Sequence, residues 1–174
     1  NMTIVKSNFA RQENELYQTE RYATEALLKH LPPIEGRVIW EPAAGNHMIA
    51  DVLHEIGAIP ITSDIAIYQR THHANYDFVG TAPAPNGFGK GSYHDIITNP
   101  PFGDGNRLAM KFCTRALEVC DGWVAMLLTE GFDSGKSRTH LFRDNPRFAM
   151  KIALLDRIMW FPGNKTGTGD HAWY

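Results

Sequence analysis

The residues with the most specific chemistry in this 174-residue chain are Asn99, Pro100, Pro101 and Phe102. They follow a short run, 94–98, whose apolar centre is typical of a buried strand. Proline has no N–H and cannot continue a sheet ladder, so the strand delivers Asn99 to its carboxyl end. An amide side chain, carbonyls fixed by proline and an aromatic face are the parts needed to hold a planar base by its exocyclic amine.

Two acidic residues occupy comparable positions earlier in the chain. Glu41 follows an apolar run, 37–40, and opens a turn of small residues, while Asp64 follows a second run, 59–63. Helical spacing between the two runs predicts a strand, loop, helix and strand, and parallel strands place both loops on one edge of the sheet. Asp64 is then placed to accept both hydroxyls of an adenosine ribose. The turn itself is not a GxGxxG, because Asn46 and His47 follow Gly45.

The rest of the chain alternates helical and strand-like patterns. We expect helices at 20–31, 49–56 and 108–120 with a short one at 137–142, further strands at 123–128, 152–155 and 158–161, and a last one beginning at 171. Residues 66–93 and 163–169 are expected to be loops. This alternation predicts an α/β fold, a mostly parallel twisted sheet with helices on both faces, within one domain spanning 1–174. The last strand stops after one aromatic pair, so we expect the native sequence to continue or to have been cut.

With these elements in place, the sequence resembles the class I S-adenosylmethionine-dependent amino-methyltransferases, a Rossmann-like family. It looks most like the DNA adenine-N6 methyltransferases. Residues 17–19 resemble the amino-terminal cofactor motif of that family, 41–45 its first-turn motif, 64–65 its ribose acid, 77–78 its adenine-binding motif and 99–102 its catalytic motif.

The resemblance implies S-adenosylmethionine as cofactor and methyl transfer to an exocyclic amine, N6 of adenine in DNA first. The implied cofactor-binding residues are Tyr17, Thr19, Glu41, Pro42, Ala43, Ala44, Gly45, Asp64, Ile65, Asp77 and Phe78, and the implied catalytic residues are Asn99, Pro100, Pro101 and Phe102. Thr19 would contact the methionine carboxylate, Glu41 the methionine amino group and Asp77 the N6 of the cofactor adenine. Phe78 and Ile65 would pack on the cofactor adenine. Asn99 and the Pro100 carbonyl would accept the hydrogens of the target amine, and Phe102 would stack on the target base.

The charge distribution indicates how a nucleic acid would be bound. The net charge is −2, but residues 131–174 hold seven Lys or Arg against four Asp or Glu. We expect no separate target-recognition domain within residues 1–174. We therefore expect DNA, or RNA as the second choice, to contact the loops 82–93 and 103–107 and the basic segment 131–165. A solvated loop surface is the alternative interpretation of the basic segment.

Composition and residue spacing bear on membrane binding, cellular location and metal sites. No apolar run approaches the roughly 20 residues that cross a bilayer, so we expect a cytoplasmic protein that does not bind a membrane. Cys113 and Cys120 fit buried free thiols, and neither they nor His47, His72 and His73 show the spacing of a metal site.

Other interpretations of the same residues stay open. The acceptor geometry of Asn99 also suits RNA adenine or a protein glutamine amide, although glutamine methyltransferases usually carry Tyr at the Phe102 position. The chain could instead be a nucleic-acid-binding module without catalysis. An NAD-dependent oxidoreductase is disfavoured by the missing GxGxxG. Thr19 could simply be the N-cap of the first helix.

Overall fold

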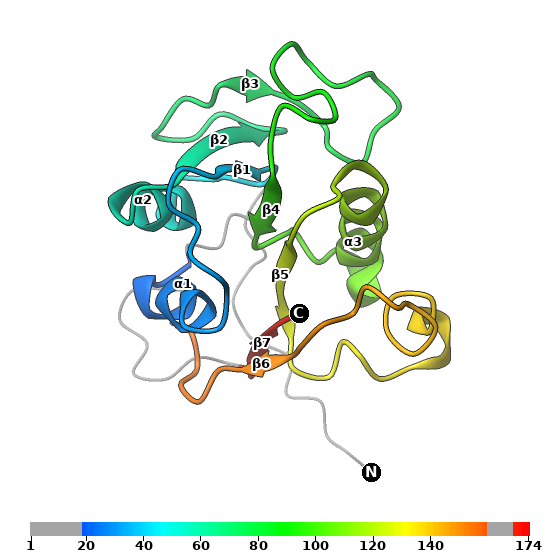
Figure 1. Ribbon diagram of the computed structural model, residues 1–174. Coiled ribbons are helices and arrows are strands. Elements are labelled where there is room, and N and C mark those ends of the chain that lie inside the picture. Colours follow the sequence, from blue (N-terminus) through cyan, green and yellow to red (C-terminus); the bar gives the residue numbers. More distant parts are fainter. Residues whose placement is uncertain (1–18, 160–168) are drawn as a thin grey trace.

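A computed structural model describes residues 19–159 and 169–174, and their strands form one mostly parallel sheet (Figure 1). The strands are β1 (Val38–Glu41), β2 (Ile59–Asp64), β3 (Ala74–Asn75), β4 (Asp95–Thr98), β5 (Val124–Thr129), β6 (Ile152–Ala153) and β7 (His171–Trp173). Their order across the sheet is β3-β2-β1-β4-β5-β7-β6, and β7 runs antiparallel to both neighbours. The predicted α/β architecture is confirmed.

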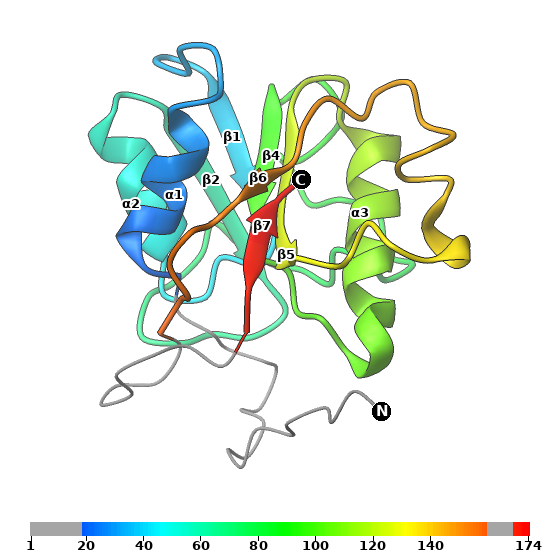
Figure 2. The ribbon, with the colours of Figure 1, turned by 90° about the horizontal axis from the view of Figure 1, so that it is seen from below.

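Helices cover both faces of this sheet. Both ribbon views show α1 (Arg21–Leu28) and α2 (Met48–Glu55) on one face and α3 (Arg107–Val119) on the other (Figures 1 and 2). Successive strand residues point to opposite faces, so Ile97 packs in the core with α1 and α2 while Ile96 packs in the core with α3. This explains why the strands are continuous apolar runs: a strand covered on both faces has no solvent side.

The start of β4 is anchored by a buried carboxylate. Asp95 is fully buried and accepts hydrogen bonds from Arg37 Nε at 2.7 Å, Arg37 Nη2 at 2.9 Å and the main-chain N–H of Trp123 at 2.9 Å. Gly122 lies so close that a Cβ there would overlap the carbonyl oxygen of His94. These contacts fix the starts of β1, β4 and β5 relative to one another and therefore fix where β4 ends.

Several predicted elements differ from the structure. The helix expected at 137–142 is a single 3-10 turn, Lys136–Arg138, and the helix expected at 20–31 ends at Leu28. The strand expected at 152–155 is reduced to two residues, and residues 158–159 of the expected strand 158–161 are not in the sheet, while 160–161 lie outside the described residues. Leu154 and Ile158 are buried in the core with α1 and α2, whereas Leu155 is 98% exposed, so these apolar residues pack against the core without pairing as strands of the sheet. The expected loop 66–93 contains β3.

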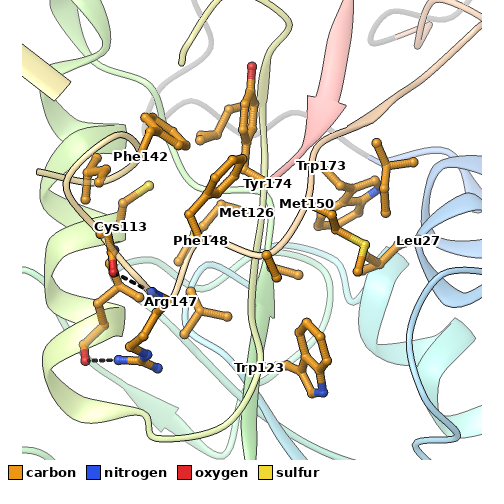
Figure 3. Close-up of a pocket in the computed structure, with 18 of the residues that line it drawn as sticks. Leu27, Cys113, Trp123, Met126, Phe142, Arg147, Phe148, Met150, Trp173 and Tyr174 are labelled. Carbon is orange, nitrogen blue, oxygen red and sulfur yellow. Dashed lines mark hydrogen bonds between the residues drawn. The ribbon is translucent and has the colours of Figure 1, made fainter. Parts of the chain in front are cut away.

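The chain between β5 and β6 packs along α3 without forming a helix of its own (Figures 1 and 2). Arg147 holds it there by donating to the carbonyl oxygen of Leu117 at 2.8 Å (Figure 3). It also donates to the carbonyl oxygen of Cys120 at 2.7 Å, so both bonds satisfy acceptors at the end of α3. An apolar pocket remains beside it, with Phe148, Met150 and Tyr174 among its lining residues. Both cysteines are free thiols buried near this layer, and burial raises the pKa of Cys113 to about 12.

No helix within the described part of the chain is both long enough and apolar enough to span a bilayer.

Candidate functional site

A pocket opens where β1, β2 and β4 end. Glu41 is the last residue of β1, Asp64 is the last residue of β2, and Asn99 directly follows β4. All three line the pocket. Its other lining residues are Thr19, Pro42, Ala43, Ala44, Gly45, Met48, Ile49, Ile65, Tyr68, Tyr76, Asp77, Phe78, Val79, Pro101, Leu108 and Phe112. The structure thus brings together residues from all five sequence motifs; the parallel strands account for Glu41, Asp64 and Asn99, and the packing of α1 accounts for Thr19.

Asp64 is fixed by main-chain donors from the two loops beside it. Its Oδ2 accepts from the N–H of Gly45 at 3.0 Å and its Oδ1 from the N–H of Ala66 at 3.2 Å. Gly45 has φ 51°, a conformation that suits glycine and lets the turn wrap around the carboxylate. Each carboxylate oxygen has a second lone pair, so Asp64 retains capacity to accept from a bound ligand.

Glu41 is a carboxylate withdrawn from water. It is 2% exposed, and its Oε2 has no hydrogen-bond partner among the described residues. Burial is the main reason that its pKa lies well above the usual value, and the charges of Asp64 and Asp51 raise that pKa further. The N–H of Ala50, in the first turn of α2, acts in the opposite direction. A buried acid with an unused oxygen is suited to a cationic or hydrogen-bond-donating ligand group.

The Asn99 amide is held from one side only. Its Nδ2 donates to Thr19 Oγ1 at 3.2 Å, while its Oδ1 is buried and has no partner among residues 19–159 and 169–174. Glu20, rather than Thr19, is the N-cap of α1, and the structure shows no side-chain capping bond there. The alternative of Thr19 as N-cap is therefore wrong, and its hydroxyl serves Asn99 instead.

Phe102 lies beside the pocket rather than among its lining residues, and so does the buried Pro100. The Phe102 ring stacks on His171 of β7, with ring centroids 6.0 Å apart and an interplanar angle of 25°. Burial lowers the pKa of His171, which keeps its imidazole neutral at physiological pH. The carbonyl of Phe102 accepts from the N–H groups of Leu108 and Ala109, so the turn after Asn99 is tied to the start of α3.

The two residues matched to the adenine-binding motif differ in burial: Phe78 lies in the core and Asp77 is exposed. Phe78 is 2% exposed and its ring packs edge-on against Trp40, 5.0 Å between centroids, so it supports the pocket from the core. Asp77 is exposed at the pocket and Ile65, 60% exposed, lies at its edge. Tyr17 lies outside the described residues. Tyr68, which lines the pocket, was not predicted, because it belongs to an irregular loop without a recognisable motif.

The turn after Gly45 is joined to the loop after Asp64 by two side-chain contacts. Asn46 Oδ1 accepts from the N–H of Gln69 at 2.9 Å, and His47 Nε2 lies 3.0 Å from His72 Nδ1. His47 has φ 66°, and its pKa is lowered, mainly by burial. Within the described part of the chain, no three His, Cys, Asp or Glu side chains are arranged to hold a metal ion.

Two of the segments expected to bind nucleic acid lie at opposite ends of the strands. The loop 103–107 follows Asn99 and borders the pocket edge. Residues 88–93 lie at the opposite edge, where Lys90 is 3.4 Å from Asp121 and Tyr93 donates to the carbonyl of Val119. Residues 88–93 of the loop 82–93 therefore gain no support as a contact for a base bound at Asn99.

Most cations of the basic segment 131–165 have local partners. Lys151 lies between Glu130 at 3.0 Å and Asp133 at 3.1 Å, and Arg157 pairs with Asp170 at 2.9 Å. Lys165 lies outside the described residues. Much of the positive charge in this segment thus stabilises the fold itself.

Comparisons with known proteins find similarity in structure alone. Neither the family models nor the curated proteins include a match to the sequence. A Pyrococcus horikoshii protein classed as an RNA methyltransferase superposes with a TM-score of 0.69 at 17% identity, over 92% of this chain and 86% of that one. The modification subunit of a protein classed as a type I restriction enzyme, from Vibrio vulnificus YJ016, superposes with a TM-score of 0.61 at 13% identity, over 91% of this chain and 44% of that one.

A third solved structure is the T. thermophilus 16S rRNA methyltransferase RsmC in complex with AdoMet and guanosine. It superposes with a TM-score of 0.53 at 18% identity, over 87% of this chain and 41% of that one. The chain has the Rossmann-like class I methyltransferase fold. It spans less than half the length of two of these three proteins.

Proposed function

We propose that this protein transfers a methyl group from S-adenosylmethionine to an exocyclic amine of a nucleic-acid base, with N6 of adenine in DNA as the first candidate. The observation that carries the proposal is the buried Oδ1 of Asn99, which has no partner among the described residues and lies in a pocket shared with Glu41 and Asp64. A buried acceptor without a partner is costly unless a ligand group uses it.

The proposed chemistry needs acceptors rather than a strong base. The lone pair of an exocyclic amine is delocalised into the ring, which makes the amine a poor nucleophile. Asn99 Oδ1 and the Pro100 carbonyl would accept its two hydrogens and favour a pyramidal nitrogen with an available lone pair. Phe102, already stacked on His171, would offer its ring to the target base, a kind of contact worth roughly 1–3 kcal/mol.

The residues of the pocket fit the proposed cofactor. S-adenosylmethionine supplies an electrophilic methyl group when bound. Glu41, with its unused buried oxygen, would face the ammonium of the methionine part, and Asp64 would accept from the ribose hydroxyls. Asp77 and the exposed Ile65 would border the cofactor adenine.

The substrate class rests on the motif and on structural neighbours together. The motif 99–102 favours adenine N6, and one neighbour belongs to a restriction-modification enzyme. Two other structural neighbours are described as RNA methyltransferases, so adenine in RNA is the second candidate. Protein glutamine remains a third acceptor with the same planar amide geometry.

The decisive experiment incubates the protein with radiolabelled S-adenosylmethionine and separate pools of DNA, RNA and protein, then identifies the methylated nucleoside or residue. Asn99→Ala should lower the transfer rate by about 10²–10³-fold, because the transition state loses one preorganised polar contact. Binding of the cofactor, measured by calorimetry, should change little.

The matched control is Asn86→Ala, which removes an exposed Asn from the loop 82–93 and should leave transfer unchanged. Full activity of Asn99→Ala would exclude the role given to Asn99. Failure of the wild-type protein to bind S-adenosylmethionine would favour a nucleic-acid-binding module without catalysis.

A further inference from the structure

The Asn99 side chain needs a defined orientation to work as proposed. The two ends of a carboxamide are similar in size but opposite in hydrogen bonding, since one donates and the other accepts. With Oδ1 toward the pocket, Asn99 accepts from a target amine; rotated by half a turn, it would present N–H groups to that amine and repel it. Some contact must therefore favour one orientation.

Thr19 is placed to supply that contact. Asn99 Nδ2 donates to its hydroxyl oxygen at 3.2 Å, which leaves Oδ1 toward the pocket. The residues next in the chain, Pro100 and Pro101, have no N–H that could compete for Oδ1. We propose that Thr19 is a positioning residue, whose hydroxyl accepts from the Asn99 amide and holds the amide oxygen in the orientation that receives a target amine.

Thr19 is itself held in place by α1. It is 4% exposed, and the helix that begins two residues later is fixed to the sheet by the Trp173 indole, whose Nε1 donates to the carbonyl of Ala23 at 2.7 Å. Glu20, between them, accepts from the N–H of Met159. The hydroxyl that orients Asn99 therefore lies in the segment that leads directly into α1, a helix tied to the sheet by the Trp173 indole.

The Thr19 hydroxyl also has a hydrogen of its own to donate. Because Thr19 lines the pocket, a ligand carboxylate bound there would take this hydrogen. The hydroxyl would then have only its lone pairs to offer Asn99, so it could no longer donate to Oδ1. A carboxylate-bearing ligand should thus tighten the orientation of Asn99. This step rests on the proposed function, whereas the contact between Thr19 and Asn99 does not.

The test follows the Asn99 side-chain amide by ¹⁵N NMR in the whole protein. In Thr19→Val, which keeps the side-chain shape and removes the hydroxyl, the Asn99 NH₂ resonances should shift and their hydrogens should exchange with water faster. Thr19→Ser, which restores the hydroxyl, should return both values toward those of the wild type. The matched control is Thr24→Val, because Thr24 Oγ1 is buried in α1, five residues after Thr19, and has no partner among the described residues.

Two ligands test whether a bound carboxylate tightens the contact between Thr19 and Asn99, separately from whether that contact exists. S-adenosylhomocysteine carries the carboxylate and should slow exchange of the Asn99 NH₂ hydrogens further, whereas methylthioadenosine lacks it and should not. In the methyl-transfer assay, Thr19→Val should lower kcat by about tenfold without raising KM for the nucleic acid, as expected for a lost hydrogen bond that orients a catalytic group.

Each outcome bears on the proposal. Unchanged Asn99 resonances in Thr19→Val, or the same change in Thr24→Val, would overturn it. If neither ligand binds, the proposed function fails, while the resonances of the unliganded variants still decide whether Thr19 orients Asn99.

Discussion

At the scale of single residues, protonation of Glu41 should make ligand binding in the pocket depend on pH. Burial and the neighbouring charges of Asp64 and Asp51 raise its pKa well above the usual value in the free protein. A ligand ammonium beside it would stabilise the carboxylate and lower that pKa. Binding of S-adenosylmethionine should therefore release protons between the two pKa values, and affinity should increase as pH rises toward the pKa of the free protein.

Calorimetry in buffers of different ionisation enthalpy measures this proton release directly. Glu41→Gln should abolish it and weaken binding. At neutral pH it should also stabilise the unliganded protein, because folding no longer has to protonate or bury a carboxylate at this position. Asp77→Asn alters a carboxylate that is exposed at the same pocket and should leave proton release intact. Wild-type binding without proton exchange at any pH would contradict the role of Glu41.

At the scale of elements, the close approach of Gly122 to β4 controls the frame that places Asn99. A Cβ at Gly122 would overlap the His94 carbonyl and lie 2.6 Å from Asp95 Oδ1, so backbone would have to move. Gly122→Ala should lower the free energy of unfolding by about 1–3 kcal/mol in denaturant titration. Gly131→Ala is the control: the nearest atom to its Cβ would be Ser134 Oγ at 3.8 Å, so its effect should stay within about 0.5 kcal/mol. Equal losses in the two variants would show that Gly122 has no special constraint.

The same elements show what could be predicted from the sequence. The strands β1, β2, β4 and β5 and the helix α3 follow from local apolar periodicity. The acids and Asn99 gather because parallel strands end at one edge. Local patterns contain no information on contacts between distant segments, such as Thr19 with Asn99 or Phe102 with His171, which depend on how α1 and β7 pack. For the same reason β3, defined by two hydrogen-bonded residues at the sheet edge, had no signature.

At the scale of the whole molecule, the proposed action on a nucleic acid requires positive charge at the pocket edge of the sheet. Because the net charge is −2, it matters where the exposed cations lie. Most cations of 131–165 are paired within the fold. By contrast, Arg107 and Lys111 are exposed on one side of α3, just after the loop 103–106, and form no ion pair with another described residue. They lie one helical turn apart, so they can contact successive phosphates of a strand that delivers its base to Asn99.

Arg107→Ala and Lys111→Ala should each weaken binding of a DNA or RNA oligonucleotide. Each should also reduce the slope of log affinity against log salt concentration by about one, the change expected when one phosphate contact is lost. Fluorescence anisotropy over a salt series measures both quantities. Lys29→Ala is the matched control, since Lys29 is an exposed lysine at the end of α1 on the opposite face of the sheet and should change neither quantity. An equal effect of all three substitutions would mean that the nucleic acid is attracted by overall charge rather than held at the pocket edge by α3.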